Sequence, residues 1–356
     1  MINLQITIGD TDLHYLQKLS DYFMSVKTHH FSVKTFSDLP NLLNHLNTES
    51  TDILLITEKL YKQLHNIPPM TLLLRENGVG SNIKEHLSIP KYQSGSKIVE
   101  QMIHYYTLQS TSEVQFAPNR KRTALIGIYS PSGGSGKTTL SLMLSKALAA
   151  KGKNTLFISL EEIASYKHVL SATDETSLSD LLYYAHKRSD NLMMKLEGIQ
   201  RLDKESGLKF IPAPIHSDDM LLSEDADWYY LLDYLLKFSD FETIVLDFTS
   251  VLSQRNVELF KKCQQLFVTT NFSFQQNAKL TAFVKTYGEV LGDKLTLLAN
   301  LTKPMVEEVL VTVEGYDIKT TIPYMERLYQ NSSNGIGQQM DDSCGEALMA
   351  LVRGGA

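Results

Sequence analysis

The chain has 356 residues, more than a single hydrophobic core usually serves, so we expect two domains. Its net charge of −6 argues against a general nucleic-acid binder, and no direct DNA binding is expected. The only cysteines, Cys263 and Cys344, exclude a disulfide framework and a cysteine zinc site.

The first part of the chain alternates strand-like and helix-like patterns. Apolar strand segments are expected at residues 4–10, 31–36, 52–57, 70–75 and 86–93. Between them leucine and phenylalanine recur at helical spacing, and the last helix is expected over residues 96–108. This alternation predicts an α/β domain with a doubly wound parallel sheet over residues 1–109.

Acidic residues follow the first expected strand. Asp10 and Asp12 stand where receiver domains of two-component response regulators bind magnesium, and the order and size of the elements resemble that family. In that family an aspartate at the end of the third strand accepts phosphate, but Thr57 stands there, and Lys91 matches the family's lysine only loosely. Threonine cannot form an acyl phosphate, so the resemblance implies a receiver-like domain without phosphorelay chemistry. Helix capping by the two aspartates is favoured over metal binding.

A polar segment separates this domain from the rest of the chain. Residues 110–122 lack periodicity and carry the turn signal Pro118-Asn119, which predicts a linker. The basic run over residues 120–122 is expected to be a solvated end of this linker. A second domain is then expected over residues 123–356.

The second domain opens with a glycine cluster between a strand and a helix. An apolar strand is expected over residues 124–130, and a helix with one apolar face is expected to begin near Lys137 and to end at Gly152. In this context backbone N–H groups can close around phosphate oxygens, and the helix N-terminus favours an anion. The expected phosphate-binding residues of the loop are Gly133, Gly134, Ser135 and Gly136.

The residues that follow the glycines complete the expected nucleotide site. Lys137 is expected to reach the outer phosphates of a bound triphosphate. The hydroxyl of Thr138 would bind Mg²⁺, and Thr139 could hold the α-phosphate. Pro131 replaces the glycine that usually begins such a loop, at little cost, because this position mainly shapes the entry into the loop.

Polar residues are expected at the ends of three further strands. A strand over residues 154–162 carries Glu161, and one over 241–250 carries Asp247, where a carboxylate can bind Mg²⁺ through water. An unpaired carboxylate is costly to bury, so a metal or hydrogen-bond role is expected for Asp247. Asn300 lies near the end of a third strand, over residues 295–301.

The order of these motifs over residues 123–356 resembles the MinD/ParA class of P-loop ATPases. The resemblance implies that the cofactors are ATP and Mg²⁺, with Thr138 and Asp247 at the metal. It further implies that Lys137 and Glu161 are catalytic, with Glu161 orienting the attacking water. The residues that would contact the base are Asn300, Pro323 and Tyr324.

The chain departs from this class at positions that matter for hydrolysis. Ser132 stands where the class usually has a lysine that crosses a face-to-face dimer to the partner's nucleotide, and Ser159 replaces a usual aspartate. A positive group on the transferring phosphate contributes roughly 10³ to 10⁵ in rate in related sites. We therefore expect a homodimer that binds nucleotide and hydrolyses it weakly.

The two domains together resemble the TadZ/CpaE family of pilus-assembly proteins. Residues 176–236, between the second and third ATPase motifs, carry a helix, a short strand near 211–214 and another helix, as in that family. The resemblance implies a cytoplasmic factor that is recruited to a cell pole at the inner membrane face. Its partners would be components of the tight-adherence (Tad) pilus secretion machinery. This step is an analogy, because a fold does not establish a function.

Two other functions remain open from the sequence. The first is a MinD/ParA-type positioning ATPase, although the C-terminal segment lacks the basic amphipathic pattern of a membrane helix. The second is a capsule-type bacterial tyrosine kinase, which would end in a tyrosine-rich tail, whereas the last tyrosine here is Tyr329. No stretch reaches the roughly 18 apolar residues of a membrane span, so no integral membrane segment is expected.

Overall fold

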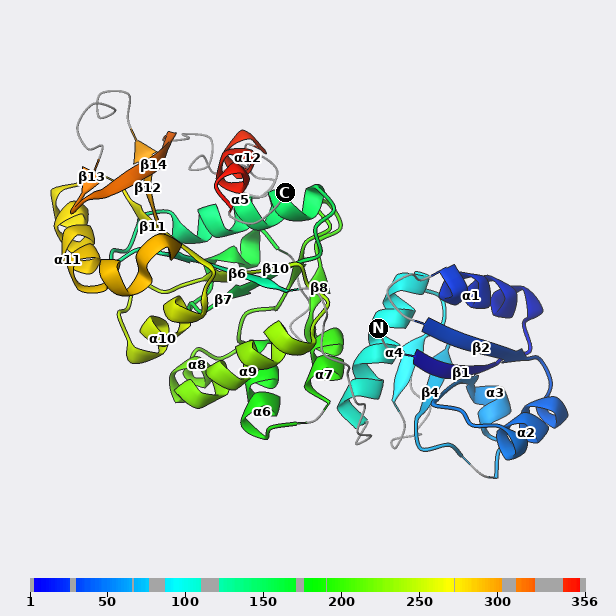
Figure 1. The fold of residues 1–356 in the computed structure, drawn as a ribbon. Helices are drawn as coiled ribbons and strands as arrows, with labels where there is room; N and C mark the ends of the chain where they lie inside the picture. Colours follow the sequence, from blue (N-terminus) through cyan, green and yellow to red (C-terminus); the bar gives the residue numbers. More distant parts are fainter. Residues whose placement is uncertain are drawn as a thin grey trace. The chain divides into compact units, whose positions relative to one another are not determined.

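The computed structural model describes residues 3–25, 30–65, 67–76, 87–109, 122–170, 176–189, 191–271, 273–302, 312–323 and 342–352. The chain divides into two compact units, one built from Met1–Val114 with Met194–Gly198 and the other from Gln115–Met193 with Ile199–Ala356 (Figure 1). Each unit contains α-helices and its own mainly parallel sheet, which confirms the expected fold class. The expected linker lies outside the described residues, apart from Arg122.

The sheet of the first unit has five parallel strands. Its strands are β1 (Asn3–Gly9), β2 (His30–Phe36), β3 (Ile53–Thr57), β4 (Thr71–Arg75) and β5 (Ser88–Pro90). The spatial order β2-β1-β3-β4-β5 is one of the two common orders of doubly wound sheets. The fifth strand is much shorter than the segment expected over residues 86–93.

Helices cover both faces of this sheet. They are α1 (Leu13–Ser25), α2 (Leu39–Thr48), α3 (Glu58–Tyr61) and α4 (Gly95–Gln109). Leu42 of α2 and Leu60 of α3 join Ile56 in one buried cluster, whereas α1 and α4 contact each other on the opposite face. The apolar runs of β3 and β4 are thus buried from both sides, as parallel strands require.

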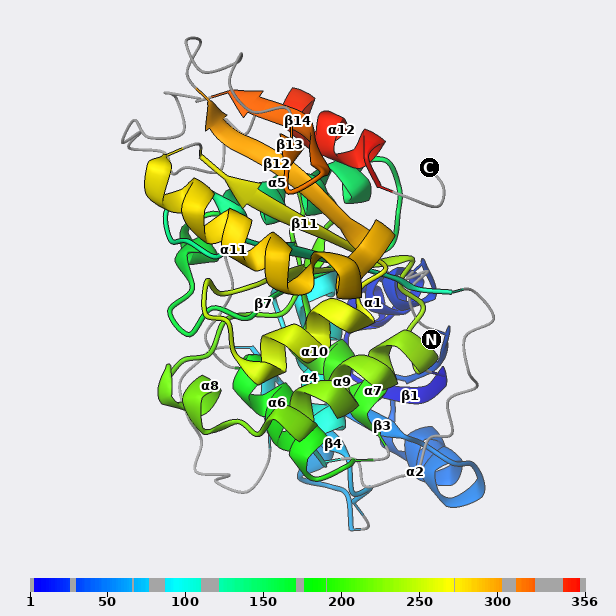
Figure 2. The ribbon, with the colours of Figure 1, turned by 60° about the vertical axis from the view of Figure 1, so that its left-hand side comes forward.

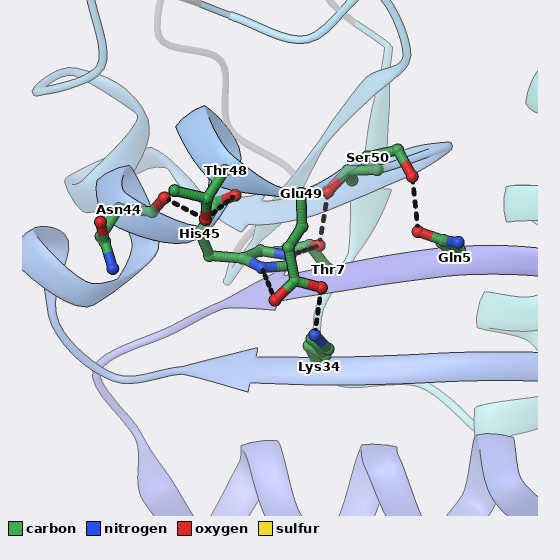
Figure 3. A network of polar contacts seen from close by, with 9 residues as sticks. Gln5, Thr7, Lys34, Asn44, His45, Thr48, Glu49 and Ser50 are labelled. Carbon is green, nitrogen blue, oxygen red and sulfur yellow. Dashed lines mark hydrogen bonds and ion pairs between the residues drawn. The ribbon is translucent and has the colours of Figure 1, made fainter.

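A polar network fastens α2 to the first two strands (Figure 3). His45 is buried in α2, and its Nε2 lies 3.0 Å from Thr7 Oγ1 of β1. Nδ1 lies 3.6 Å from Glu49 Oε1, and Glu49 in turn pairs with Lys34 of β2. The ring also stacks on Phe36, at 4.8 Å between centroids. One histidine therefore holds a helix against two strands.

The sheet of the second unit has nine strands, in the order β13-β14-β12-β11-β6-β10-β7-β9-β8. The pairings are parallel except for the two hairpins at the edges, β8 with β9 and β13 with β14. The strands are β6 (Ala124–Tyr129), β7 (Thr155–Ser159), β8 (Arg201–Leu202), β9 (Lys209–Phe210), β10 (Thr243–Asp247), β11 (Gln265–Thr270), β12 (Leu295–Thr302), β13 (Thr312–Val313) and β14 (Tyr316–Pro323).

The helices that follow β6 in the chain are α5 (Lys137–Ala150), α6 (Leu178–His186), α7 (Leu192–Ile199), α8 (Asp218–Leu222), α9 (Asp225–Phe238), α10 (Gln254–Lys262), α11 (Phe274–Leu291) and α12 (Asp342–Ala350), with short 3₁₀ turns at Ser165–His168 and Gly292–Lys294. Helices α5 and α12 cover one face of the sheet, and α10 and α11 cover the other (Figures 1 and 2). Among the described residues no helix is long and apolar enough to span a bilayer.

The central strand β6 supplies side chains to both faces. Ile126 and Ile128 join the cluster beneath α5 and α12. Tyr129 points the other way, with its ring centroid 4.7 Å from that of Phe260 in α10 and 5.2 Å from that of Phe283 in α11. Because β6 is fixed on both sides, its carboxyl end is a rigid starting point for the loop that follows.

Helix α12 lies unusually close to α5 because it carries a glycine at the contact. A Cβ atom at Gly345 would lie 2.9 Å from the carbonyl oxygen of Met143 and 2.9 Å from Cβ of Ala147. Lys151 and Glu346 form an ion pair of 3.0 Å between the two helices. The helix that follows the glycine loop is therefore held along its length by a second helix.

Candidate functional site

The glycine cluster forms a loop between β6 and α5. Gly134 has φ +69° and Gly136 has φ +81°, both in the left-handed region that favours glycine. A Cβ atom built at Gly133 or Gly134 would have no atom within 4 Å, so the space around these two residues is open. The loop thus combines a helix N-terminus with room for an anion, as a bound phosphate requires.

Two side chains, one from a strand and one from a helix, both far away in the sequence, hold this loop in place. Asn300 of β12 donates from Nδ2 to the carbonyl oxygen of Ser135 at 2.8 Å, and Gln276 of α11 donates from Nε2 to that of Gly133 at 3.2 Å. A Cβ atom at Gly136 would lie 2.2 Å from Nδ2 of Asn300. Glycine is therefore required at position 136 both for its backbone conformation and for this close approach.

Lys137 is the first residue of α5, and its side chain is buried. Its Nζ donates a hydrogen bond to Ser250 Oγ at 2.7 Å. Burial lowers the pKa of Lys137, and the negative charges of Asp247 and Glu161 oppose this effect. The ammonium group therefore feels the charge of both carboxylates and donates a hydrogen bond to one hydroxyl.

Asp247 ends β10 and is fully buried. Its carboxylate accepts hydrogen bonds from Ser159 Oγ at 2.9 Å and from Ser141 Oγ at 3.2 Å. Burial and the charge of Glu161 raise the pKa of Asp247 to about 7, while hydrogen bonds from Ser159 and Thr138 lower it. The structure thus brings together Thr138 and Asp247, the two residues expected to bind a metal.

Glu161 lies just beyond the strand that was expected to carry it. Strand β7 ends at Ser159, two residues earlier, and the backbone N–H of Glu161 donates to Ser159 Oγ at 3.3 Å. The Glu161 side chain is half-buried and accepts a hydrogen bond from Ser165 at 3.5 Å. Its charge acts on both Lys137 and Asp247, so all three groups share one site.

The other expected site residues are less close to this centre. Thr139 follows Thr138 in the first turn of α5 and is half-buried. Asn300 is 3% exposed, and its amide already binds the loop, so its expected contact with a base stays a prediction. Pro323 is exposed at the end of β14, and Tyr324 lies outside the described residues.

Three residues of the site were not expected from the sequence. Ser141 binds Asp247 from one turn after Lys137, a spacing that the helix pattern could have revealed. Ser250 binds Lys137 across 113 residues, and Gln276 binds Gly133 across 143 residues. No local pattern marks either of these two residues, because their contacts depend on the packing of elements that are far apart in the chain.

Part of this chain is similar to known proteins. A family model described as an AAA domain matches residues 123–297. The septum site-determining protein MinD from Pyrococcus horikoshii OT3, solved with Mg-ADP, superposes with a TM-score of 0.50 at 19% identity over 64% of this chain and 96% of its own. A ParA family ATPase from Chlorobium tepidum TLS gives 0.50 at 19% identity, over 64% of this chain and 91% of its own. No curated protein matched the chain.

These similarities concern the second unit. At 19% identity the two solved structures show a shared fold. The family match covers the glycine loop, Glu161 and Asp247.

Proposed function

We propose that the second unit binds ATP and Mg²⁺ at the loop over residues 133–139. The observation that carries this proposal is the convergence of Lys137, Asp247 and Glu161 beside an open glycine loop at the start of a helix. The MinD structure with the same fold was solved with Mg-ADP. Adenine is preferred to guanine only by the family resemblance.

Each residue then has a defined role. The loop amides and Lys137 would hold the phosphates, while Thr138 and Asp247 would hold Mg²⁺, which neutralises charge on the phosphates when bound. Thr139 would contact the α-phosphate. Glu161, which is half-buried and acts by its charge on Asp247, would orient the attacking water. Lys137 Nζ donates to a hydroxyl of Ser250 in this structure, and a phosphate would give the ammonium group an anionic acceptor.

Binding of the Mg²⁺ nucleotide is expected to weaken below pH 7. The carboxyl of Asp247 has a pKa of about 7, and a metal needs it ionised, so a proton must leave on binding. Affinity should fall by up to about tenfold for each pH unit below this value. Calorimetry from pH 5.5 to 8 checks this. The same titrations of Asp247→Asn provide the control, because protonation of ATP itself affects both proteins equally.

The carboxyl of Asp247 gives folding stability the opposite pH dependence to nucleotide binding. Its folded pKa of about 7 is raised from 3.8, so the unfolded chain binds fewer protons between these values. The contribution of Asp247 to stability is therefore present below about pH 4 and is lost as the pH rises to 7.

For nucleotide binding, an equal pH dependence in the wild type and in Asp247→Asn would contradict the assignment of Asp247 as a metal-binding residue.

Asn300→Ala tests whether this residue holds the loop or reads the base. Losing the hydrogen bond to Ser135 should cost about 1 kcal/mol and weaken ATP and GTP by a similar factor, roughly five- to tenfold. Equilibrium binding of fluorescent analogues of ATP and GTP measures the factor by which each affinity falls. A loss confined to ATP would instead support the base contact that the family resemblance implies.

We infer that two copies meet over this site. Exposed apolar side chains follow each strand end around it: Ile163 (83% exposed), Val251 (59%), Leu252 (48%) and Phe274 (89%). Ile163 is two residues from Glu161, and Phe274 is two residues from Gln276, which binds the loop. Parallel strands place these residues at the same edge of the sheet, where burial by a second copy would stabilise a dimer. Without a lysine at position 132, hydrolysis in this dimer would be slow.

The first unit is proposed to be receiver-like without phosphorelay. Asp12 accepts a hydrogen bond from the N–H of Tyr15 and so caps α1, as favoured from the sequence. Asp10 instead forms a buried ion pair with Lys91, 2.7 Å long, directly after β5. Thr57 ends β3 and carries no carboxylate.

Acetyl phosphate is expected to leave the first unit unmodified. Asp10 is already neutralised by a buried ammonium group, and Thr57 cannot form an acyl phosphate. Intact mass spectrometry after incubation with acetyl phosphate and Mg²⁺ checks this, with an active receiver domain as the positive control. An aspartyl phosphate within residues 1–109 would contradict the proposal.

At the level of the cell, we propose that this chain is an assembly factor for a Tad pilus, recruited to a cell pole. The combination of a receiver-like unit with a P-loop unit that lacks the signature lysine supports this role over a general MinD/ParA positioning ATPase. Deletion of the gene from its host should abolish these pili. The wild type should restore them, whereas Lys137→Ala should not. A deletion strain that still assembles pili would overturn the role without affecting the nucleotide site.

A further inference from the structure

The second unit contains a pocket that shares no residue with the nucleotide site. It has a volume of about 490 Å³ and is lined by residues of α6, α8 and α9 and the segment between the last two. Helices α6 and α9 lie side by side (Figures 1 and 2). The ends of two packed helices therefore frame the pocket.

The lining of this pocket is strongly acidic. It contains four carboxylates, from Asp180, Asp219, Glu224 and Asp227, and no lysine or arginine. The imidazole of His186 is the only nitrogen-bearing side chain in the lining. Asp180 is engaged in capping α6, where its Oδ2 accepts from the N–H of Ser177 at 2.8 Å. The remaining charges favour a cation in the pocket.

Three of these side chains converge on one point. His186, Glu224 and Asp227 each offer a ligand atom, and these atoms all lie within 4.8 Å of one another. Nδ1 of His186 is 3.0 Å from Oδ2 of Asp227. Two ligand atoms on one tetrahedral zinc ion lie about 3.3 Å apart, given metal–ligand bonds of about 2.0–2.1 Å. The separation of this one pair, which is hydrogen-bonded here, is thus close to that of two ligand atoms on zinc.

Asp227 is the buried member of this cluster. Its side chain is 5% exposed in the first turn of α9, whereas His186 is 51% exposed at the end of α6. Oδ1 of Asp227 has no hydrogen bond among the described residues, and Nη1 of Arg188 lies 3.3 Å from Asp227 Oδ1. The guanidinium also stacks on Tyr230, at 4.5 Å from the ring centroid. Arg188 therefore occupies Oδ1 of the carboxylate, whereas Oδ2 faces Nδ1 of His186, and a bound ion would replace that contact.

We propose that His186, Glu224 and Asp227 bind a divalent transition-metal cation, with Zn²⁺ as the representative. One imidazole with two carboxylates is a mixed nitrogen and oxygen donor set, which suits zinc and its neighbours. Mg²⁺ prefers oxygen ligands and retains its waters, so it competes poorly for an imidazole. The ion links the end of α6 to the start of α9, and its binding does not require a nucleotide.

Calorimetry of the full chain tests the proposal. The protein is stripped with EDTA, dialysed, and titrated with ZnCl₂ at pH 7.5 without nucleotide and in excess Mg²⁺. One Zn²⁺ per chain is expected to bind. His186→Gln and Glu224→Gln, both at exposed positions, should each weaken binding at least about tenfold. His65→Gln, an exposed histidine of the first unit, is the matched control and should have no effect.

Arg188→Gln is a variant that should strengthen Zn²⁺ binding rather than weaken it. Removing the guanidinium from Asp227 removes a competing positive charge, so Zn²⁺ affinity should rise several-fold while the three ligands remain. Circular dichroism of each variant establishes that it is folded. The proposal is overturned if the folded wild type binds no Zn²⁺ at pH 7.5. It is equally overturned if the bound Zn²⁺ is unaffected by His186→Gln and Glu224→Gln.

Discussion

Lys137→Ala is expected to abolish the stabilisation of this protein by Mg²⁺-ATP. At a nucleotide concentration about 100-fold above the dissociation constant, binding should stabilise the wild type by about 2.7 kcal/mol. The variant should show none of this shift. Differential scanning calorimetry of the full chain, with and without nucleotide, measures the difference directly.

The expected loss follows from the position of this ammonium group. Lys137 Nζ donates a hydrogen bond to Ser250 Oγ, and the charges of Asp247 and Glu161 act on it. Without it, two carboxylates would face the phosphates with no positive side chain between them. The nucleotide-free protein should lose much less, because burial already lowers the pKa of Lys137 and so penalises its charge.

Lys151→Ala is the matched control for this experiment. Lys151 caps the other end of α5, and its side chain is 55% exposed in an ion pair with Glu346. Exposed pairs contribute at most about 1 kcal/mol, and the nucleotide shift should remain intact. If Lys137→Ala retained the full shift, the phosphate-binding assignment would be wrong.

Ser132→Lys is expected to raise ATP hydrolysis, by up to roughly 10³-fold, if two copies meet as proposed. Oγ of Ser132 is buried and makes no hydrogen bond among the described residues, so its loss removes no polar contact. The backbone N–H that binds Ser130 is unaffected by the change. A lysine stem is flexible enough to carry its ammonium group from this position into the space between two copies.

Ser132→Gln separates the effect of charge from that of side-chain length. Phosphate release should rise in the lysine variant and stay at the wild-type level in the glutamine variant. Sedimentation with Mg²⁺-ATP establishes the dimer in each case. An unchanged rate for Ser132→Lys in a demonstrated dimer would count against a catalytic group supplied across the interface.

Much of the fold could be predicted from the sequence because its signals are local. The apolar runs that became β3, β6 and β10 are buried strands, and the glycine cluster falls between a strand and a helix as expected. Asp247 also ends its strand as expected. Such features depend on neighbours within a few residues, which a pattern can represent.

The rest of the site depends on residues far apart in the chain. The amide of Asn300 reaches Ser135 across 165 residues, which its place near a strand end does not reveal. Ser250 pairs with Lys137 only because β10 lies beside β6. Similarly, His186 and Asp227 meet through the packing of α6 against α9. Sequence patterns indicate which side chains are available, and the tertiary packing decides which of them meet.

The absence of a side chain at Gly345 has a practical consequence. This residue sets the spacing between α12 and α5, and α5 begins with Lys137. Alanine, serine and valine at position 345 would wedge the two helices apart by increasing amounts. Such a series would yield graded, heat-sensitive alleles that alter nucleotide handling without touching any residue of the nucleotide site, and would allow the protein to be switched off in growing cells.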